Sequence, residues 1–295
     1  MLTVRNLHKS IDRRPVLREV GFTLAPGQVA GLIGRNGAGK TTLLKTMAGV
    51  MTPDLGTVEY EGRSIHRDMS AKENVVFVPD HIEPWHGYTP YGCADFYSRI
   101  YPRFDMNDFK RTLDRFGLPL GRNVRLFSKG MKMMFATALG LATKAPYVLL
   151  DEPTNGVDPI AKKQVLSLLM EAASEGTALL ISSHLLEELE RMTDTILLLK
   201  DGSVEAYTSE DVGGGRVIKL QVAFAGEPPA DWLASPEVRV LDHIGRVYTL
   251  LVGTEGEGSA YEELRRLNPL LMEPLPVKLE DLYLWKLDGG DRDAG

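Results

Sequence analysis

The residues from Gly34 to Thr42 have the types and spacing to bind the phosphates of a nucleotide. Gly34–Thr41 matches the pattern G-x-x-x-x-G-K-[ST], in which backbone N–H groups surround phosphate oxygens and Lys40 reaches the β- and γ-phosphates. Glycines are needed because a Cβ would block the close approach of backbone to phosphate. The hydroxyl of Thr41 is a candidate Mg²⁺ ligand. The predicted nucleotide-binding residues of this loop are Gly34, Asn36, Gly37, Ala38, Gly39, Lys40, Thr41 and Thr42.

A second candidate site is the carboxylate pair Asp151 and Glu152, which follows the apolar run Val148–Leu150. Ligands of open α/β sheets bind beyond the carboxyl ends of the strands. Asp151 suits the Mg²⁺ shell, and Glu152 can orient and deprotonate the water that attacks the γ-phosphate. Taken alone, such a pair more often caps a helix or opens a turn, since Pro153 follows. The phosphate loop favours the catalytic interpretation, so we expect hydrolysis of MgATP.

A parallel sheet would bring these two sites together. Strand-like runs precede the glycine loop at Leu2–Leu7, Glu19–Leu24 and Gln28–Ile33. A helix-like stretch, Lys40–Ala48, follows the loop. Two later runs, Tyr147–Leu150 and Ala178–Ser182, are continuously apolar, which suits parallel strands covered on both faces. Helical segments between them predict an α/β layering.

With 295 residues and a hydrophobic content of 43%, the chain has the length for two domains. We expect a nucleotide-binding domain over residues 1–210, with a helical lobe at about 84–145 indicated by Cys93–Tyr101 and Asn107–Phe116. An accessory α+β domain over 211–287 is indicated by Val217–Phe224, Val238–Leu241, Val247–Val252 and Ser259–Leu267. The Gly- and Asp-rich residues 288–295 are predicted to be disordered.

The composition argues against several classes of function. The formal net charge is −6, and no long run of Lys or Arg could follow a nucleic-acid backbone, so we expect no nucleic-acid partner. Cys93 is the only cysteine, which excludes an intrachain disulfide and favours a reducing, cytoplasmic compartment. No apolar run approaches the roughly 18 residues that span a bilayer, and Met1–Arg5 does not look like the start of a secretory signal. Any membrane role then needs a partner chain.

Four further elements resemble those of the ATP-binding cassette (ABC) ATPases, over about Leu2–Tyr207. Phe127–Met131 is similar to the family's signature Leu-Ser-Gly-Gly-Gln, and Asn155–Asp158 is similar to its D-loop. His184 is similar to the switch histidine, and Val78–Asp80 stands at the place of the Q-loop. The resemblance implies an α/β P-loop NTPase cassette with a mostly parallel core sheet, an N-terminal antiparallel β part and an inserted helical lobe, followed here by the accessory domain.

The resemblance also implies roles for residues outside the phosphate loop. Ser128 and Gly130 would cap the γ-phosphate bound by the opposite subunit, so hydrolysis requires a second ABC ATPase subunit in a homodimer or a heterodimer. Asp158 would contribute to nucleotide binding and His184 to catalysis. From the residues alone, Ser128 is also a helix N-cap, and a histidine such as His184 more often caps a helix or lies in a core. An apolar stripe follows Ser128 at Met131, Met134, Phe135, Ala138, Leu139 and Ala142.

Several departures from the family's pattern affect the site. Ile11 occupies the place of the aromatic residue that usually stacks on adenine, which predicts weaker base discrimination and leaves the preference for ATP or GTP open. Asp80 replaces the Q-loop glutamine; its carboxylate can reach Mg²⁺ directly or through water, and a turn residue after Pro79 is an equal alternative. Lys129 and Met131 replace glycine and glutamine in the signature, which we interpret as a mark of exporter-type ATPases.

Together these features predict the ATP-hydrolysing subunit of an ABC transporter, with ATP and Mg²⁺ as its cofactors. The resemblance implies an integral membrane permease that docks on Pro84–Val124, where Trp85, Tyr88 and Tyr91 form either a contact patch or part of the core. Lys278–Tyr283 resembles the closing helix of exporter ATPases and favours export, at the inner face of the cell membrane. The alternatives are a non-transport ABC ATPase acting on ribosomes or DNA and a P-loop kinase or GTPase. The single cassette, the signature serine and the missing Asn-Lys-x-Asp string argue against them.

Overall fold

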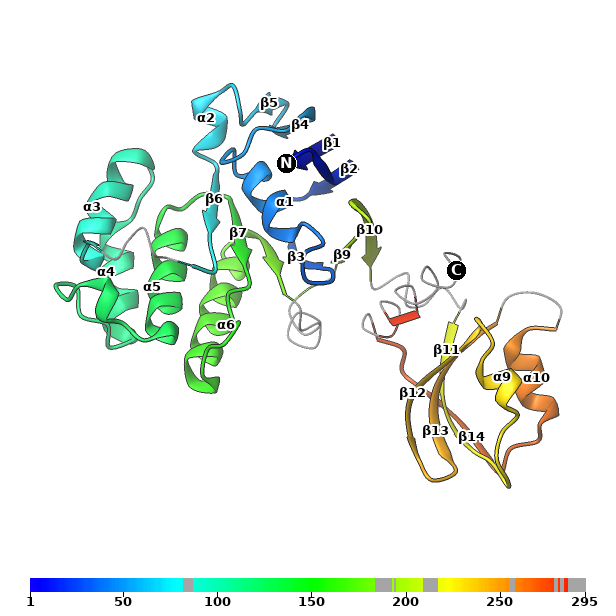
Figure 1. The fold of residues 1–295 in the computed structure, drawn as a ribbon. Helices are drawn as coiled ribbons and strands as arrows, with labels where there is room; N and C mark the ends of the chain where they lie inside the picture. Colours follow the sequence, from blue (N-terminus) through cyan, green and yellow to red (C-terminus); the bar gives the residue numbers. More distant parts are fainter. Residues whose placement is uncertain are drawn as a thin grey trace. The chain divides into compact units, whose positions relative to one another are not determined.

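The computed structural model describes residues 1–81, 87–183, 193, 195–208, 217–254, 258–278, 281, 284 and 285. The chain divides into two units, Met1–Ala206 and Tyr207–Gly295 (Figure 1). Each unit has a hydrophobic core of its own. Within these residues, no helix combines the length and the apolar character needed to cross a membrane. The predicted disordered tail, 288–295, lies outside the described residues.

The first unit is built on a six-stranded sheet in the order β10-β9-β3-β8-β7-β6. Its strands are β3 (Val29–Ile33), β6 (Val75–Val78), β7 (Tyr147–Asp151), β8 (Ala178–Ser182), β9 (Thr195–Lys200) and β10 (Ser203–Thr208). Strands β6 to β9 and β3 pair in parallel, and β3, β7 and β8 are buried at every position, as their apolar runs predict. Parallel pairing places the carboxyl ends of β3, β6, β7 and β8 at one edge of the sheet.

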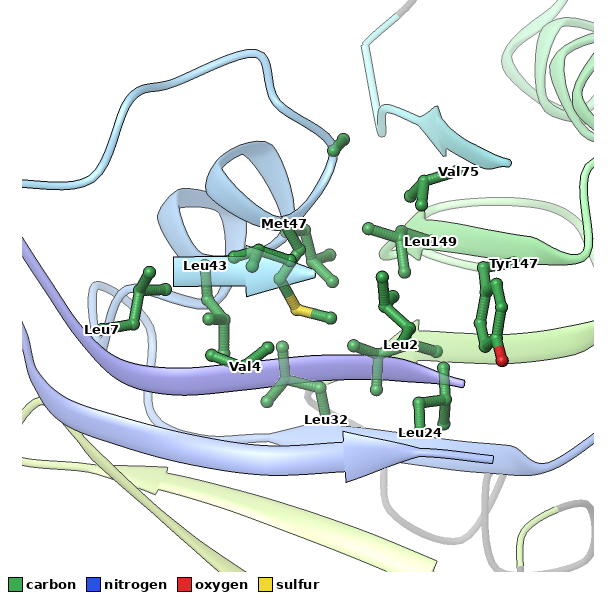
Figure 2. Close-up of a cluster of buried hydrophobic side chains, with 14 of the residues drawn as sticks. Leu2, Val4, Leu7, Leu24, Leu32, Leu43, Met47, Val75, Tyr147 and Leu149 are labelled. Atoms are coloured by element: carbon green, nitrogen blue, oxygen red, sulfur yellow. The ribbon is translucent and has the colours of Figure 1, made fainter. Parts of the chain in front are cut away.

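A second, antiparallel sheet has the order β2-β1-β4-β5, formed by β1 (Leu2–Ile11), β2 (Arg14–Leu24), β4 (Leu55–Tyr60) and β5 (Arg63–Ser64). Figure 2 shows Leu2 and Val4 of β1 and Leu32 of the core sheet meeting Leu43 and Met47 of α1 (Lys40–Met47). Burial of each such side chain contributes about 1.5–3 kcal/mol, which holds α1 firmly between the two sheets. A short helix, α2 (Met69–Lys72), follows β5.

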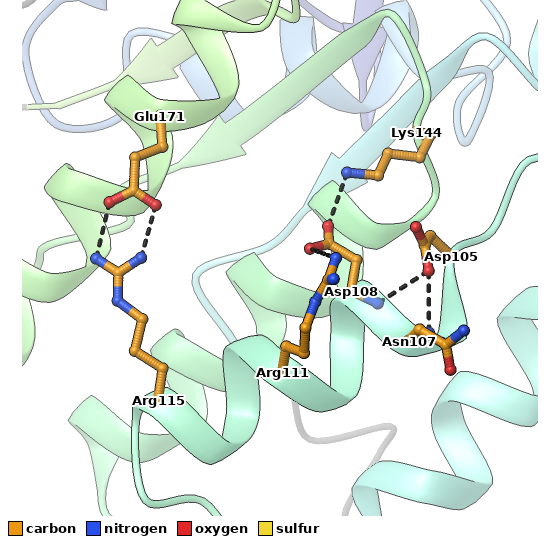
Figure 3. A network of polar contacts seen from close by, with 7 residues as sticks. All are labelled: Asp105, Asn107, Asp108, Arg111, Arg115, Lys144 and Glu171. Atoms are coloured by element: carbon orange, nitrogen blue, oxygen red, sulfur yellow. Dashed lines mark hydrogen bonds and ion pairs between the residues drawn. The ribbon is translucent and has the colours of Figure 1, made fainter.

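The helices α3 (Pro90–Ile100), α4 (Met106–Arg115) and α5 (Lys129–Ala142) fall within the span predicted for the helical lobe, with a 3-10 turn at Val124–Leu126. Helix α6 (Pro159–Ser174) contacts both α5 and β8. Figure 3 shows the polar contacts between these elements: Arg115 of α4 binds Glu171 of α6 through two hydrogen bonds of 2.6 and 2.7 Å, and Lys144 binds Asp108 at 2.7 Å. These ion pairs are exposed, so each contributes at most about 1 kcal/mol.

The second unit contains an antiparallel sheet in the order β12-β13-β11-β14. Its elements are β11 (Val217–Ala223), α9 (Ala230–Leu233), β12 (Val238–Ile244), β13 (Val247–Gly253), α10 (Ala260–Arg266) and β14 (Leu271–Leu275). Leu220 and Val222 of β11 pack in one core with Trp232 of α9 and Leu264 of α10. The strands and the helix predicted for this region are confirmed, whereas α9 and β14 were not predicted.

Candidate functional site

The phosphate loop joins the end of β3 to the start of α1. Gly39 precedes α1 with a φ of 106°, a left-handed conformation that favours glycine. A Cβ on Gly39 would lie 2.7 Å from Cγ1 of Val16, and a Cβ on Gly34 would lie 2.6 Å from the carbonyl oxygen of Leu199. Both positions therefore exclude a side chain. The loop also places its N–H groups beside the N-terminus of α1, where an anion is favoured.

Lys40 is the first residue of α1 and is only 7% exposed. Its ammonium donates a hydrogen bond to the carbonyl oxygen of Gly34 (2.8 Å) and lies 3.6 Å from Oε1 of Glu152. A charged donor that is largely removed from water binds phosphate oxygens more strongly than an exposed one. Lys40 thus connects the phosphate loop with the acid pair.

Asp151 is the last residue of β7, and its carboxylate is held by two hydroxyl groups. Oδ2 accepts a hydrogen bond from Thr41 (2.6 Å), and Oδ1 accepts one from Ser182 (2.7 Å). Thr41 and Asp151, which the sequence predicts as ligands of one Mg²⁺ ion, are therefore in direct contact. The donors are a hydroxyl and a carboxylate oxygen, which is the ligand type that Mg²⁺ prefers.

Ser182 is a residue of this site that the sequence analysis did not identify. It ends β8 opposite Asp151, and its hydroxyl accepts a hydrogen bond from the N–H of Glu152 (2.9 Å). Glu152 has a φ of 48°, a conformation that costs a residue with a side chain roughly 1–2 kcal/mol. The bonds to Ser182 stabilise this backbone. A serine closing a wholly apolar strand was the signal available in the sequence.

A cavity of about 560 Å³ opens over these groups, within the size range of ligand pockets. The predicted residues that line it are Ile11, Asn36, Gly37, Gly39, Lys40, Thr41, Thr42, Asp80, Asp151 and Glu152. Val16, Arg35 and Asn155 line it as well. Of the other loop residues, Ala38 packs against the hydrophobic core. The fold thus brings the loop, the acid pair, Ile11 and Asp80 to one cavity.

Asp80 follows β6 at the edge of this cavity. Its pKa is raised because burial disfavours the charged form and because Asp151 and Glu152 repel it, whereas His81 and Lys129 attract it and oppose the rise. Nε2 of His81 lies 3.2 Å from the Asp80 carboxylate. A cation in the cavity would relieve the repulsion among the three carboxylates.

The donor set suits an ion that shares its ligands with a substrate. Among the described residues, no three His, Cys, Asp or Glu side chains converge closely enough to hold a metal alone. Mg²⁺ characteristically takes one or two carboxylates and completes its octahedron with phosphate oxygens and water. Thr41 and Asp151 fit that pattern, so Mg²⁺ would be held together with a bound nucleotide.

Ser128 caps α5 by accepting a hydrogen bond from the N–H of Met131 (3.2 Å), which confirms the N-cap interpretation. Most of the predicted stripe behind it, from Met134 to Ala142, is buried. Asp158 caps α6 in the same way, through Ile160. Among the described residues that line the cavity, none comes from the signature. The nucleotide roles of Ser128, Gly130 and Asp158 therefore stay predictions.

Two of the predicted features lie wholly or partly outside the described residues. His184 directly follows Ser183, where the description stops, so its catalytic role stays a prediction. Of Lys278–Tyr283, only Lys278 and Asp281 are described.

A family model described as ABC transporter matches residues 17–155 of this chain. The ABC transporter ATP-binding protein YtrB of Bacillus subtilis is 34% identical over 293 residues, which cover 99% of this chain and 100% of the relative. The lantibiotic transport ATP-binding protein SrtF of Streptococcus pyogenes is 33% identical over 69% of this chain and 89% of the relative.

Solved structures show the same architecture. The structure of an ATP-binding subunit of an ABC transporter has a TM-score of 0.66 and 27% identity, over 72% of this chain and 91% of that chain. A dimeric bacterial ABC transporter cassette has a TM-score of 0.61 and 21% identity, over 70% of this chain and 98% of that chain. The predicted fold class is thereby confirmed.

Proposed function

The chain belongs to the ABC transporter family as an ATP-binding subunit that hydrolyses ATP, and from this premise we propose that it drives a separate membrane permease in the direction of export. One observation carries the catalytic part: buried Lys40 stands 3.6 Å from Glu152 in a cavity bounded by the phosphate loop. Both groups face the space that a γ-phosphate and its attacking water need.

In this proposal Glu152 is the general base. A γ-phosphate held by Lys40 would lie within reach of a water molecule bound to the Glu152 carboxylate, because the two side chains are 3.6 Å apart. Ser182 supports that role by holding the N–H of Glu152 at 2.9 Å. Mg²⁺, when bound, neutralises charge on the β- and γ-phosphates. Thr41 and Asp151 would hold it, and Asp80 is a further candidate ligand.

The working assembly is a head-to-tail pair of ATPase subunits. Ser128 is exposed at the N-terminus of α5, a 14-residue helix, where a phosphate bound by another subunit would be favoured. Gly130 and Asp158 lie at the same end of their helices. The dimeric description of one structural relative supports this arrangement. The second subunit is a copy of this chain or a related ATPase.

Two relatives support a role in transport, and one segment of the sequence supports the export direction. One relative is named for lantibiotic transport, and the relative YtrB is matched along its whole length, accessory domain included. The resemblance of Lys278–Tyr283 to the closing helix of exporter ATPases supports the direction.

The helical lobe offers the docking surface for the permease. Tyr88 and Tyr91 are 53% and 51% exposed, so the alternative that these two aromatics pack in the core is wrong. Leu126 is exposed as well, and Trp85 lies outside the described residues. Exposed aromatic and aliphatic side chains are typical of protein contacts. Docking there would hold the ATPase at the inner face of the cell membrane.

Isolation of the native assembly in mild detergent tests the proposal. We expect an integral membrane protein to co-purify and, after reconstitution into vesicles, to support ATP-dependent turnover. Co-purification of ribosomes or DNA instead would contradict it. Lys40→Ala is the matched control for the ATP-dependent turnover. Loss of the charged hydrogen bonds of Lys40 should weaken ATP binding by about 1.5–3 kcal/mol, roughly ten- to a hundredfold in Kd.

A further inference from the structure

Lys129 stands at a helix position where a cation is unfavourable. It is the first residue of α5, and the first turn of this helix contains no acidic residue. Cations near a helix N-terminus are disfavoured by the helix dipole. Residues that break such a local rule are often retained for function. A lysine at this position therefore calls for a contact outside its own helix.

That contact is with Gly156 of the D-loop, Asn155–Asp158. A Cβ on Gly156 would lie 2.6 Å from Nζ of Lys129 and 3.5 and 3.6 Å from its Cε and Cδ. The end of the lysine side chain thus runs across Gly156, which has a φ of 63°. Gly130, which follows Lys129 in the sequence, approaches the other end of the D-loop, because a Cβ on Gly130 would lie 2.9 Å from Oδ2 of Asp158.

The D-loop is in turn bonded to the acid pair of the same subunit. The N–H of Asn155 donates to the carbonyl oxygen of Glu152 at 3.1 Å, and Asn155 lines the nucleotide cavity beside Glu152. The N–H of Val157 donates to the carbonyl oxygen of Thr154 at 3.3 Å, which keeps the loop a tight turn. A displacement of Gly156 would therefore move the adjacent Asn155, and the hydrogen bond of Asn155 would pass this displacement to the backbone of Glu152.

We propose that Lys129 is a positioning residue for the Glu152 of its own subunit: its side chain holds the D-loop at Gly156 and so fixes the backbone of the catalytic base. The inference rests on the proposed function of Glu152. It gives the lysine a role within its own subunit, in addition to the role of the neighbouring Ser128 toward the opposite subunit. It also links the helical lobe, through α5, to the catalytic cavity.

Steady-state kinetics of the full-length protein test this inference. Lys129→Met removes the ammonium and shortens the side chain that contacts Gly156. We expect kcat to fall by about tenfold, because the catalytic base is misplaced. The KM for ATP should stay within about twofold of its starting value, because the phosphate loop is intact. Lys129→Arg keeps a cation on a long aliphatic stem and should restore most of the turnover. Lys132→Met, which removes a cation one turn further along α5, should leave kcat unchanged.

A double-mutant cycle identifies the contact itself. Gly156→Ala places a methyl group against Nζ and should lower kcat, and in a Lys129→Ala background the same change should cost several-fold less because the space is free. Effects that simply multiply would overturn the inference. So would a raised KM in Lys129→Met, since that would place the ammonium on bound nucleotide. Loss of turnover in Glu152→Gln tests the proposed function of Glu152 separately, so a failure of this inference can be distinguished from a failure of the proposed function.

Discussion

Each unit of the molecule contains a lysine close to a carboxylate, and the two pairs differ in how they are satisfied. In the first unit, Nζ of Lys40 remains 3.6 Å from Glu152 while it bonds a loop carbonyl, beside a cavity of about 560 Å³. In the second unit, Nζ of Lys219 contacts both oxygens of Asp281 at 2.8 and 3.1 Å, and the N–H of Lys278 completes the set at 2.7 Å. The first pair is open and the second is closed.

This difference separates a site from a structural contact. A buried charge is costly unless it is paired and hydrogen-bonded. Lys40 and Glu152 line a cavity, so a bound ligand can add to the contacts that they make within the chain. The closed pair in the accessory unit joins Asp281 to β11 through Lys219, and Asp281 in turn accepts a hydrogen bond from Lys278. Changes to the open pair should therefore alter turnover and leave stability intact, and changes to the closed pair should do the reverse.

The largest effect is expected from Glu152→Gln in the open pair. The amide keeps the shape of the side chain but cannot accept a proton, so kcat should fall by about 10²–10⁴-fold. ATP affinity should be unchanged, because Lys40 and the phosphate loop remain. Turnover and equilibrium binding of labelled ATP measure the two quantities.

Wild-type turnover in Glu152→Gln would show that another group is the base. Thermal unfolding provides the control, since a variant with an unchanged Tm has lost chemistry and not structure.

The closed pair should respond in the opposite way to Asp281→Asn. This change leaves Lys219, whose side chain is 16% exposed, without its anion, which typically costs about 3 kcal/mol of folding free energy. Denaturant unfolding of the accessory unit should show this loss, with kcat of the ATPase unchanged. Glu227→Gln, on an exposed loop of the same unit, is the matched control. A fall in kcat without loss of stability would instead assign Asp281 to the catalytic cycle.

Local patterns in the sequence predicted many of the elements of both units. The continuous apolar runs at β7 and β8 predicted buried parallel strands, and the spacing Gly34–Thr41 predicted the phosphate loop. The order of the strands was not predictable from the sequence alone, because the partners of β3, namely β8 and β9, lie far along the chain and no local signal states which strands pair.

Contacts between distant residues were likewise beyond the sequence. Ser182 contacts Asp151 and Glu152 only because β7 and β8 pair in register. A single serine in the sequence does not indicate this register. The approach of Lys129 to Gly156 depends on how α5 packs beside α6. By contrast, the N-cap role of Ser128 is a property of one short segment and could be predicted.

A smaller effect is expected from Ile11→Tyr, in the same cavity as Lys40 and Glu152. Ile11 lines the nucleotide cavity, where an aromatic ring could stack on the base of a nucleotide. Base–aromatic stacking contributes about 1–3 kcal/mol, of which isoleucine supplies part, so ATP affinity should rise by roughly 1 kcal/mol, about fivefold. Binding measured with ATP and GTP tests this, and Ile11→Leu should change neither. Unchanged ATP affinity in Ile11→Tyr would place the base elsewhere.

The smallest effect is expected at Asp80, and it depends on pH. Burial and the repulsion of Asp151 and Glu152 raise the folded-state pKa of Asp80 above its ordinary value of 3.8, so ionisation of Asp80 destabilises the fold at neutral pH. Asp80→Asn removes that charge and should raise the Tm of the nucleotide-free, Mg²⁺-free protein at pH 7. The gain in the free energy of unfolding should be at most about 1 kcal/mol, because the Asp80 carboxylate is partly exposed and screened by water.

The sign follows from linkage. Below the unfolded pKa, near 3.8, Asp80 is protonated in both states, so the advantage of Asp80→Asn should shrink as pH falls toward that value. Because Nε2 of His81 lies 3.2 Å from the carboxylate, the series should be repeated in a His81→Gln background, which removes the imidazole from this contact. A Tm difference that is constant across the pH range would mean that the Asp80 carboxylate is not repelled by the acid pair. The repulsion that a bound cation would relieve would then be weaker than the positions of Asp80, Asp151 and Glu152 indicate.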